Sequence, residues 1–189
     1  MTNASIGIIH GDVKPQNILI FKDNSGNYVA KVADFGYSTQ FVNDEELVKM
    51  PKSWPWNAPE HHHRGFKPSQ ARKMDAYSFG ILCLWLMFKE KILEVNANSR
   101  NAFEERDCGF LSPKECHEEY AIQEFLEELK SGDKSPDFAR SLTQKTTCLD
   151  DELKSNLDEL FKLTLVCNPD CRSSDFKKFT RLLHHDRRV

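Results

Sequence analysis

The residues at positions 10–17 read HGDVKPQN, and three of them are of types that together could transfer a phosphoryl group. Such a transfer needs an acceptor for the proton of the attacking hydroxyl, and cations that hold and neutralise the phosphates. Asp12 suits the proton acceptor, and Lys14 brings an ammonium within two residues of it. Asn17 offers an amide oxygen, a ligand that the hard cation Mg²⁺ prefers. The segment therefore predicts a catalytic loop.

A second carboxylate, that of Asp34, opens the tripeptide Asp34-Phe35-Gly36 directly after a predicted strand. This carboxylate could complete, with Asn17, the protein ligands of one Mg²⁺. Gly36 would give the loop the freedom to bend. We therefore expect Asp12, Asn17 and Asp34 to converge on a single magnesium-held nucleotide.

The elements that must position these residues begin as a small β-unit. Short apolar runs at 6–9 and 18–21 flank the first segment and predict strands. A dense turn signal at 23–27 precedes a partner strand at 28–33. Residues 34–60 have no clean hydrophobic period and include three prolines, so we expect a long ordered loop there.

Helices are predicted behind this unit, the strongest at 73–88. Its second half is apolar on every side, which is typical of a buried helix, and we expect it to be the central helix of the fold. Residues 89–114 turn polar and irregular, and 115–130 recover an amphipathic helical pattern. The fold class expected is α+β, mostly α.

Capping residues place the last two helices. Asp150 is expected to cap one helix, and Ser173 or Ser174 to start the final one. The inner face of that final helix would carry Phe176, Phe179, Leu182 and Leu183.

The composition, with 39% hydrophobic and 29% charged residues among 189, is typical of a soluble globular domain. A net charge of −3 gives no reason to expect nucleic acid or a membrane as partner. The apolar run at 79–88 is too short to cross a bilayer. Six scattered cysteines predict free thiols and, without a visible leader, a cytoplasmic or nuclear protein.

The order and spacing of five motifs resemble the C-terminal lobe of eukaryotic-type protein kinases. Residues 10–17 match the family's catalytic loop, Asp34-Phe35-Gly36 its magnesium motif, and Ala58-Pro59-Glu60 the end of its activation segment. Residues 75–80 match the start of its central helix, and 168–172 its late arginine motif. The resemblance implies one partial kinase domain over 1–189. It would consist of the catalytic loop and magnesium motif at 6–36, an activation segment at 34–60 and a helical subdomain at 73–185.

The resemblance also implies roles for individual residues. The cofactors would be ATP and Mg²⁺, with Asn17 and Asp34 holding the metal and Leu19 joining them in nucleotide binding. Catalysis would rest on Asp12, Lys14 and Ser53, and the last two are similar to the serine/threonine-directed pattern. Six further residues would be structural: His10 packs behind the loop, Asp75 accepts catalytic-loop amides, Arg172 pairs with Glu60, and Phe35 and Gly36 complete the magnesium motif.

Two departures from the family pattern affect regulation and completeness. Gly11 stands where many kinases have an arginine that receives an activating phosphate, and Lys52 stands where a glycine is common. The family's glycine-rich loop, its ATP-orienting lysine and the helix before the catalytic loop have no counterpart in residues 1–189. We therefore expect little activity from this chain alone, and a partner on the apolar face around Leu82, Trp85 and Leu86.

Alternatives stay open at several points. The protein substrate is unknown, and besides a serine/threonine kinase the sequence allows a kinase-derived binding or scaffold protein or a decayed remnant. A solvated run is expected for residues 61–63 and no zinc site at Cys167 and Cys171. Trp54 and Trp56 either pack the loop onto the core or shape a peptide groove.

Overall fold

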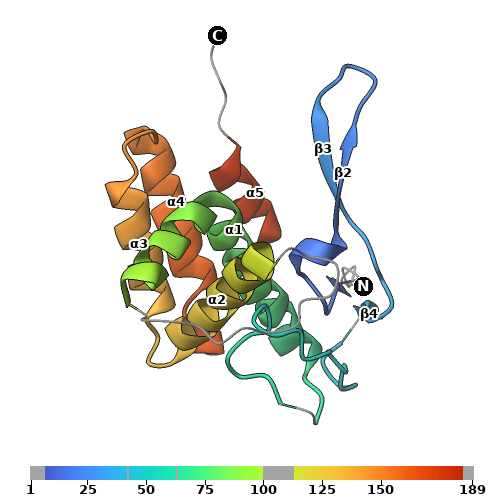
Figure 1. Cartoon of the computed structure of the whole chain (residues 1–189). Helices are drawn as coiled ribbons and strands as arrows, with labels where there is room; N and C mark the ends of the chain where they lie inside the picture. Colours follow the sequence, from blue (N-terminus) through green and yellow to red (C-terminus); the bar gives the residue numbers. More distant parts are fainter. Residues whose placement is uncertain (1–6, 42, 63, 100–112, 185–189) are drawn as a thin grey trace.

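The computed structural model of the chain describes residues 7–41, 43–62, 64–99 and 113–184. Helices form one packed group, and a long two-stranded hairpin stands apart from it (Figure 1). The segment that carries the candidate catalytic residues lies between these two parts. The expected α+β class, mostly α, agrees with this arrangement.

The β part consists of two separate antiparallel pairs. β1 (Gly7–Ile9) pairs with β4 (Thr39–Phe41), and β2 (Ile18–Lys22) pairs with β3 (Tyr28–Val32). The first three strands confirm the predicted strands. β4 lies inside the stretch predicted as a loop, and that prediction was wrong there because a strand of three residues leaves no readable period.

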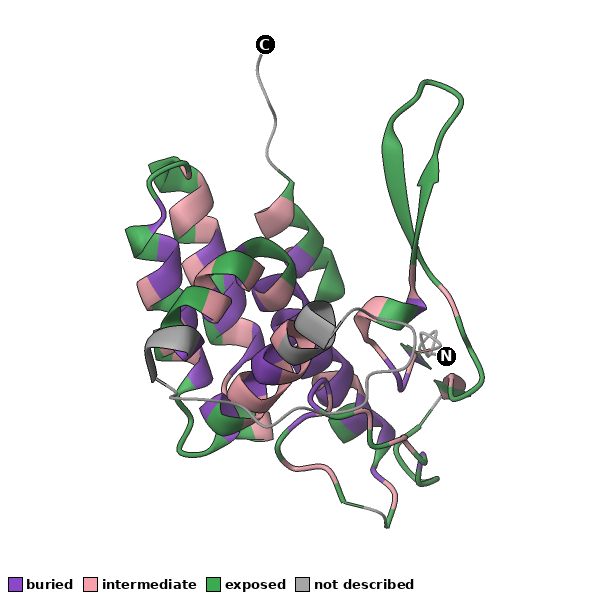
Figure 2. Ribbon diagram, viewed as in Figure 1, coloured by how far each residue is buried: buried purple, intermediate pink, exposed green. Residues whose placement is uncertain are grey.

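The β2–β3 hairpin closes through a turn that its sequence specifies. The carboxylate of Asp23 accepts hydrogen bonds from the amides of Ser25 and Asn27, both at 2.8 Å, and Gly26 adopts a φ of 83°. Beyond Ile18 the strands are exposed along their length, as the green hairpin of Figure 2 shows.

The central helix α1 (Pro68–Ser99) is longer than predicted and changes direction at Phe88, whose φ and ψ are −129° and 18°. Tyr77, Ile81 and Leu84 are fully buried, as the apolar pattern predicts. Leu86 departs from the expectation of burial on every side, since it is 61% exposed, but it agrees with the expectation of an uncovered apolar face around Leu82, Trp85 and Leu86. Leu82 of that face is instead buried, at 4% exposed.

Four more helices pack around α1, namely α2 (Pro113–Lys130), α3 (Ser135–Lys145), α4 (Asp151–Thr164) and α5 (Phe176–Leu183). Between the last two lies the short 3₁₀ turn η2 (Pro169–Cys171), and a similar turn, η1 (Pro15–Asn17), precedes β2. α1 and α4 approach closely at Gly80, where any side chain would collide with Thr164. None of the described helices is long and apolar enough to cross a membrane.

The predicted caps are partly confirmed. Asp150 caps α4 by accepting a hydrogen bond from the amide of Leu153 at 2.7 Å. The last helix is capped by Asp175 and not by Ser173 or Ser174, because the Asp175 carboxylate accepts from the amide of Lys178.

Side-chain burial in the last helix also differs from the prediction at one position. Phe179 is fully buried, whereas Phe176, predicted to face inward, is 38% exposed at the end of the helix.

Candidate active site

The carboxylate of Asp12 lies at the centre of the candidate site and is 4% exposed. Lys14 places its ammonium 2.7 Å from Oδ2, and Asn17 donates to the same oxygen at 3.1 Å. Ser53, 41 residues away in sequence, donates its hydroxyl to Oδ1 at 2.5 Å. The structure therefore brings together the three residues predicted to be catalytic and one of the two predicted metal ligands.

These contacts determine the charge of Asp12. Burial alone would raise the pKa of its carboxyl, but hydrogen bonds from Lys14, Ser53 and Asn17 and the charge of Lys14 outweigh it, and the pKa is lowered. The carboxylate is therefore ionised at neutral pH and can accept or orient a hydroxyl proton.

Asp75 in α1 binds the backbone of the catalytic loop. Its two carboxylate oxygens accept the amides of His10 at 2.7 Å and Gly11 at 2.9 Å, which are the hydrogen bonds expected of it. Burial raises the pKa of Asp75 to about 6, although both amides act in the opposite direction. Gly11 adopts a φ of 86°, a conformation that side-chain-bearing residues rarely adopt, and its backbone closely approaches Tyr37.

His10 packs behind the loop, as expected, and connects it to Ala33 and Phe35. Its Nδ1 accepts the amide of Asp12 at 3.2 Å, and its Nε2 faces the carbonyl of Ala33 at 3.0 Å. This pair of contacts fits a neutral imidazole with the proton on Nε2. The edge of the Phe35 ring lies against the imidazole, with 5.3 Å between ring centroids. Phe35 itself is 62% exposed.

Asn17 and Asp34 have a donor set that suits Mg²⁺. The amide nitrogen of Asn17 donates to the carbonyl and carboxylate of Asp12, at 2.8 and 3.1 Å, so its amide oxygen is the atom that would bind a cation. Asp34 is an exposed carboxylate whose Oδ1 accepts one amide, that of Gly36. Two oxygen ligands fit the habit of Mg²⁺ to take one or two protein groups and complete its shell with phosphate and water.

Backbone pairing brings Asp34 next to the catalytic loop. The amide of Ala33, its neighbour, donates to the carbonyl of Asn17 at 2.8 Å. The left-handed residue of this turn is Asp34, with a φ of 59°, so the bend expected at Gly36 occurs two residues earlier. Leu19, predicted to join in nucleotide binding, lies on β2 and is 45% exposed.

The loop that presents Ser53 is fixed by two different tryptophans. Trp56 is 2% exposed and packs edge-to-face on Trp85 of α1, whereas Trp54 is 37% exposed beside Tyr120 of α2. The packing alternative is therefore confirmed for Trp56, and the peptide-groove alternative stays a prediction for the partly exposed Trp54.

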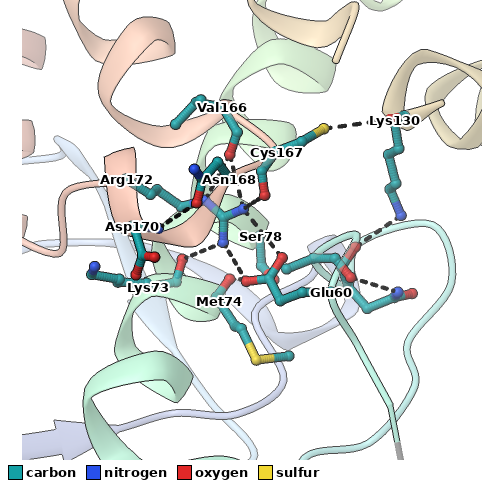
Figure 3. A network of polar contacts seen from close by, with 12 residues as sticks. Glu60, Lys73, Met74, Ser78, Lys130, Val166, Cys167, Asn168, Asp170 and Arg172 are labelled. Atoms are coloured by element: carbon teal, nitrogen blue, oxygen red, sulfur yellow. Dashed lines mark hydrogen bonds and ion pairs between the residues drawn. The ribbon is translucent and has the colours of Figure 1, made fainter. Parts of the chain in front are cut away.

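The end of the activation segment is attached to the helical part by a buried ion pair. Both terminal nitrogens of Arg172 donate to the Glu60 carboxylate, at 2.6 and 3.2 Å, as expected for this pair. The same guanidinium donates to the carbonyls of Lys73, Val166 and Cys167, and Figure 3 shows it at the centre of this network. Arg172 is 3% exposed.

Lys130 is a contact residue that the sequence analysis missed. Its buried ammonium donates to the carbonyl of Asn57 at 2.8 Å and to the Glu127 carboxylate at 2.6 Å. Burial lowers the pKa of Lys130, while the Glu127 contact acts in the opposite direction. The sequence did hold a signal, since Lys130 continues the apolar stripe of Ile122 and Leu126 at four-residue spacing.

Two other predictions concern histidines and cysteines. His61 does not belong to a solvated run: it is half-buried, its Nε2 lies 3.2 Å from the carbonyl of Met50, and its ring stacks near Phe66. The described cysteines, which include Cys167 and Cys171, are free. Among the residues with described positions, no cluster of three or more His, Cys, Asp or Glu could hold a metal ion.

Comparison with known proteins gives the relationships of the chain. The model of the protein kinase domain matches residues 4–186. The chain is 32% identical over 151 residues to the probable serine/threonine-protein kinase roco7 of Dictyostelium discoideum, which covers 74% of the chain and 6% of that protein.

Two further relatives are shorter matches. The tyrosine-protein kinase Src64B of Drosophila melanogaster is 33% identical over 109 residues, 57% of the chain and 18% of that protein. Wall-associated receptor kinase 2 of Arabidopsis thaliana is 37% identical over 94 residues, 49% of the chain and 12% of that protein. The chain thus spans less than a fifth of the length of these three relatives. With its catalytic-loop geometry and a family match over nearly all its residues, the chain belongs to the protein kinase family.

Proposed function

We propose that the chain supplies the catalytic loop and magnesium ligands of a protein kinase that transfers the γ-phosphoryl group of ATP to serine or threonine hydroxyls of proteins. The observation that carries the proposal is the buried Asp12 carboxylate, held ionised by Lys14, Asn17 and Ser53. A buried, ionised carboxylate beside an ammonium suits a group that must orient a hydroxyl and tolerate developing phosphate charge.

Each residue then has a distinct task. Asp12 accepts a hydrogen bond from the substrate hydroxyl and orients its oxygen, while the Lys14 ammonium lies where phosphoryl oxygens gain negative charge. Asn17 and Asp34 would hold Mg²⁺, which when bound neutralises part of the charge of the ATP phosphates. The exposed face of Leu19 would contact the nucleotide base.

The choice of serine or threonine over tyrosine is supported by the contact between Lys14 and Ser53. The ammonium lies 3.5 Å from the Ser53 hydroxyl, and both groups bind opposite oxygens of Asp12. This three-way contact among Asp12, Lys14 and Ser53 is the arrangement that the resemblance to serine/threonine-directed kinases implies.

The test uses three peptides that are identical except for serine, threonine or tyrosine at the acceptor position. Labelled ATP and Mg²⁺ are supplied to the natural polypeptide that contains residues 1–189, and to residues 1–189 alone. We expect label on the serine and threonine peptides from the natural polypeptide. We expect little from residues 1–189 alone, because the family's glycine-rich loop and ATP-orienting lysine do not occur in this stretch.

Asp12→Asn should lower the transfer by about 10²- to 10⁴-fold, the usual contribution of a positioned acid–base group. Asp23→Asn, at the exposed hairpin turn, is the matched control and should leave the transfer unchanged. Label on tyrosine alone would disprove the acceptor class, and undiminished transfer by the Asp12 variant would disprove the mechanism.

A second candidate function, a kinase-derived binding module, is favoured by one observation. An apolar hollow of about 440 Å³ lies between the hairpin and the helices, and Phe79, Leu82 and Leu86 of α1 are among its walls. Exposed apolar surface of this kind suits a protein partner. A binding module should still bind its partner after Asp34→Ala and should lose it after Leu86→Glu. Neither of these two variants should show detectable phosphate transfer.

A further inference from the structure

A second hollow opens directly beside the catalytic carboxylate. Its volume is about 640 Å³, and its walls include Lys14, Lys52, Ser53, Trp54, Trp56 and Gln123. Lys14 and Ser53 are the residues that contact the Asp12 carboxylate, at 2.7 and 2.5 Å. A hydroxyl that approaches Asp12 therefore brings its neighbouring residues into this hollow.

The charges on the walls of this hollow are of one sign. Of the described residues that line it, Lys14 and Lys52 are charged, and both are cations. The ammonium of Lys14 already pairs with Asp12. Lys52 is exposed and forms no ion pair with a carboxylate of the described residues, and its charge contributes to lowering the pKa of Lys130. Lys52 is therefore the cation available to a bound peptide.

Carboxylates are near but belong to a different hollow. Glu124, Glu127 and Glu128 of α2 line a space of about 270 Å³ whose fourth wall is Trp54. Trp54 lines both spaces, and none of these three glutamates lines the space of the lysines. Glu127 is moreover paired with Lys130 at 2.6 Å. The positive charge of Lys52 is thus not offset within its own hollow.

We propose that Lys52 is a specificity-determining residue that selects protein substrates with an acidic side chain close to the acceptor serine or threonine. This inference rests on the proposed function, because it takes Asp12 as the group that meets the acceptor hydroxyl. Lys52 directly precedes Ser53, whose hydroxyl touches Asp12. An extended peptide advances about 3.3 Å per residue, so the side chain that reaches Lys52 belongs to a residue one or two positions from the acceptor.

The experiment measures peptide binding, which needs no phosphoryl transfer. Labelled serine peptides that differ only in carrying aspartate, alanine or lysine at the positions one and two residues from the acceptor are titrated with the chain, and anisotropy is recorded. We expect the aspartate peptide to bind about two- to fivefold more tightly than the alanine peptide, as for one exposed charge pair. This difference should disappear in 1 M salt, where the Debye length is about 3 Å.

Three variants assign the preference to one side chain. Lys52→Ala should abolish the preference, Lys52→Arg should keep it, and Lys52→Glu should make the lysine peptide the tighter ligand. Lys177→Glu makes the same change of charge at an exposed site of α5, away from this hollow, and should change nothing. Since Lys52 and Lys177 are both exposed, neither variant should alter the unfolding transition, which is checked in parallel.

The outcomes separate this inference from the proposed function. Equal affinities, a preference for the lysine peptide, or no measurable binding would overturn the role of Lys52. Selective binding of acidic peptides without phosphate transfer by the natural polypeptide would support the peptide selectivity assigned to Lys52 and disprove the kinase reaction. Transfer to peptides irrespective of their charge would support the reaction and disprove the selectivity.

Discussion

Replacing Arg172 by methionine should destabilise the protein more than any exposed charge change. The guanidinium makes two hydrogen bonds to Glu60 and four more to three backbone carbonyls. Its side chain is 0% exposed, and it lies 4.8 Å from the ring centre of Tyr77. Methionine fills much of this volume but supplies none of the donors.

The magnitude follows from what the substitution leaves behind. The Glu60 side chain is 22% exposed, so its carboxylate would lose its counter-charge while remaining largely shielded from water. Breaking a buried pair by removing one partner costs about 3–5 kcal/mol. Domains have free energies of unfolding of about 5–15 kcal/mol, so Arg172→Met should use a large part of the total.

Arg140→Met is the matched control, because its ion pair has nearly the same length, 2.7 against 2.6 Å, but not the same burial. Arg140 donates to Asp158 at 2.7 Å with 46% of its side chain exposed. Exposed pairs of this kind contribute little, so this variant should unfold at nearly the urea concentration of the wild type. Urea unfolding followed by tryptophan fluorescence gives both midpoints and slopes.

Equal losses in the Arg172 and Arg140 variants would refute the argument that burial sets the value of the Glu60 pair. A further check is the double variant Glu60→Met/Arg172→Met. It should recover part of the stability lost by Arg172→Met, because no unpaired charge then remains in the interior.

Three more predictions concern the loop and the helix contact. Asp75→Asn should remove a pH dependence of the free energy of unfolding. Because burial raises the folded pKa of Asp75 to about 6, its contribution to stability is fully present only below about pH 4 and is lost as the pH rises through 6. Urea titrations at pH 4 and 7 should therefore show wild type losing about 2 kcal/mol more than the variant, and parallel curves would contradict this. Gly80→Ala should cost about 1–3 kcal/mol by overpacking against Thr164, and an unchanged urea midpoint would mean that α1 and α4 are not in close contact. Gly11→Ala should cost about 1–2 kcal/mol because of its φ of 86°, and a rise in melting temperature would exclude that backbone conformation.

Spacing in the sequence was sufficient to predict the catalytic loop. Asp12, Lys14 and Asn17 lie within six residues, so a single short turn brings them together, and the 3₁₀ turn η1 does so. The contacts of Asp75 with the loop amides and of Arg172 with Glu60 required the family resemblance, since 64 and 112 residues separate these partners. No local pattern reports contacts at such separations.

The elements that were missed are short or depend on tertiary packing. α3 has few apolar positions, and its buried Ala139 and Leu142 are defined by the helix α4 that packs on it. Its proline near the first turn was nevertheless a readable start signal. The Lys130 contact with Asn57 joins residues 73 positions apart, and only the folded structure shows which carbonyl the ammonium meets.

The exposure of Leu86 could not be predicted from its apolar pattern alone. Hydrophobicity predicts that a side chain prefers burial. It does not show whether the described part of the chain supplies a helix or strand that packs on it. Leu86 and Ile8 are 61% and 62% exposed although both are large and apolar. The apolar pattern was read correctly at both positions, and the exposure of Leu86 agrees with the expectation of an uncovered face around Leu82, Trp85 and Leu86.

The central claim, that Asn17 and Asp34 hold one metal ion on a nucleotide beside Asp12, is tested most directly by Mn²⁺ resonance. Mn²⁺ replaces Mg²⁺, ATP is added to the natural polypeptide, and bound metal is measured by electron paramagnetic resonance. The account predicts that Asn17→Ala and Asp34→Ala each lower the affinity for the metal–nucleotide complex. The double variant should bind this complex no less tightly than the single variant with the lower affinity. Independent, additive losses, or an affinity that neither substitution reduces, would contradict it.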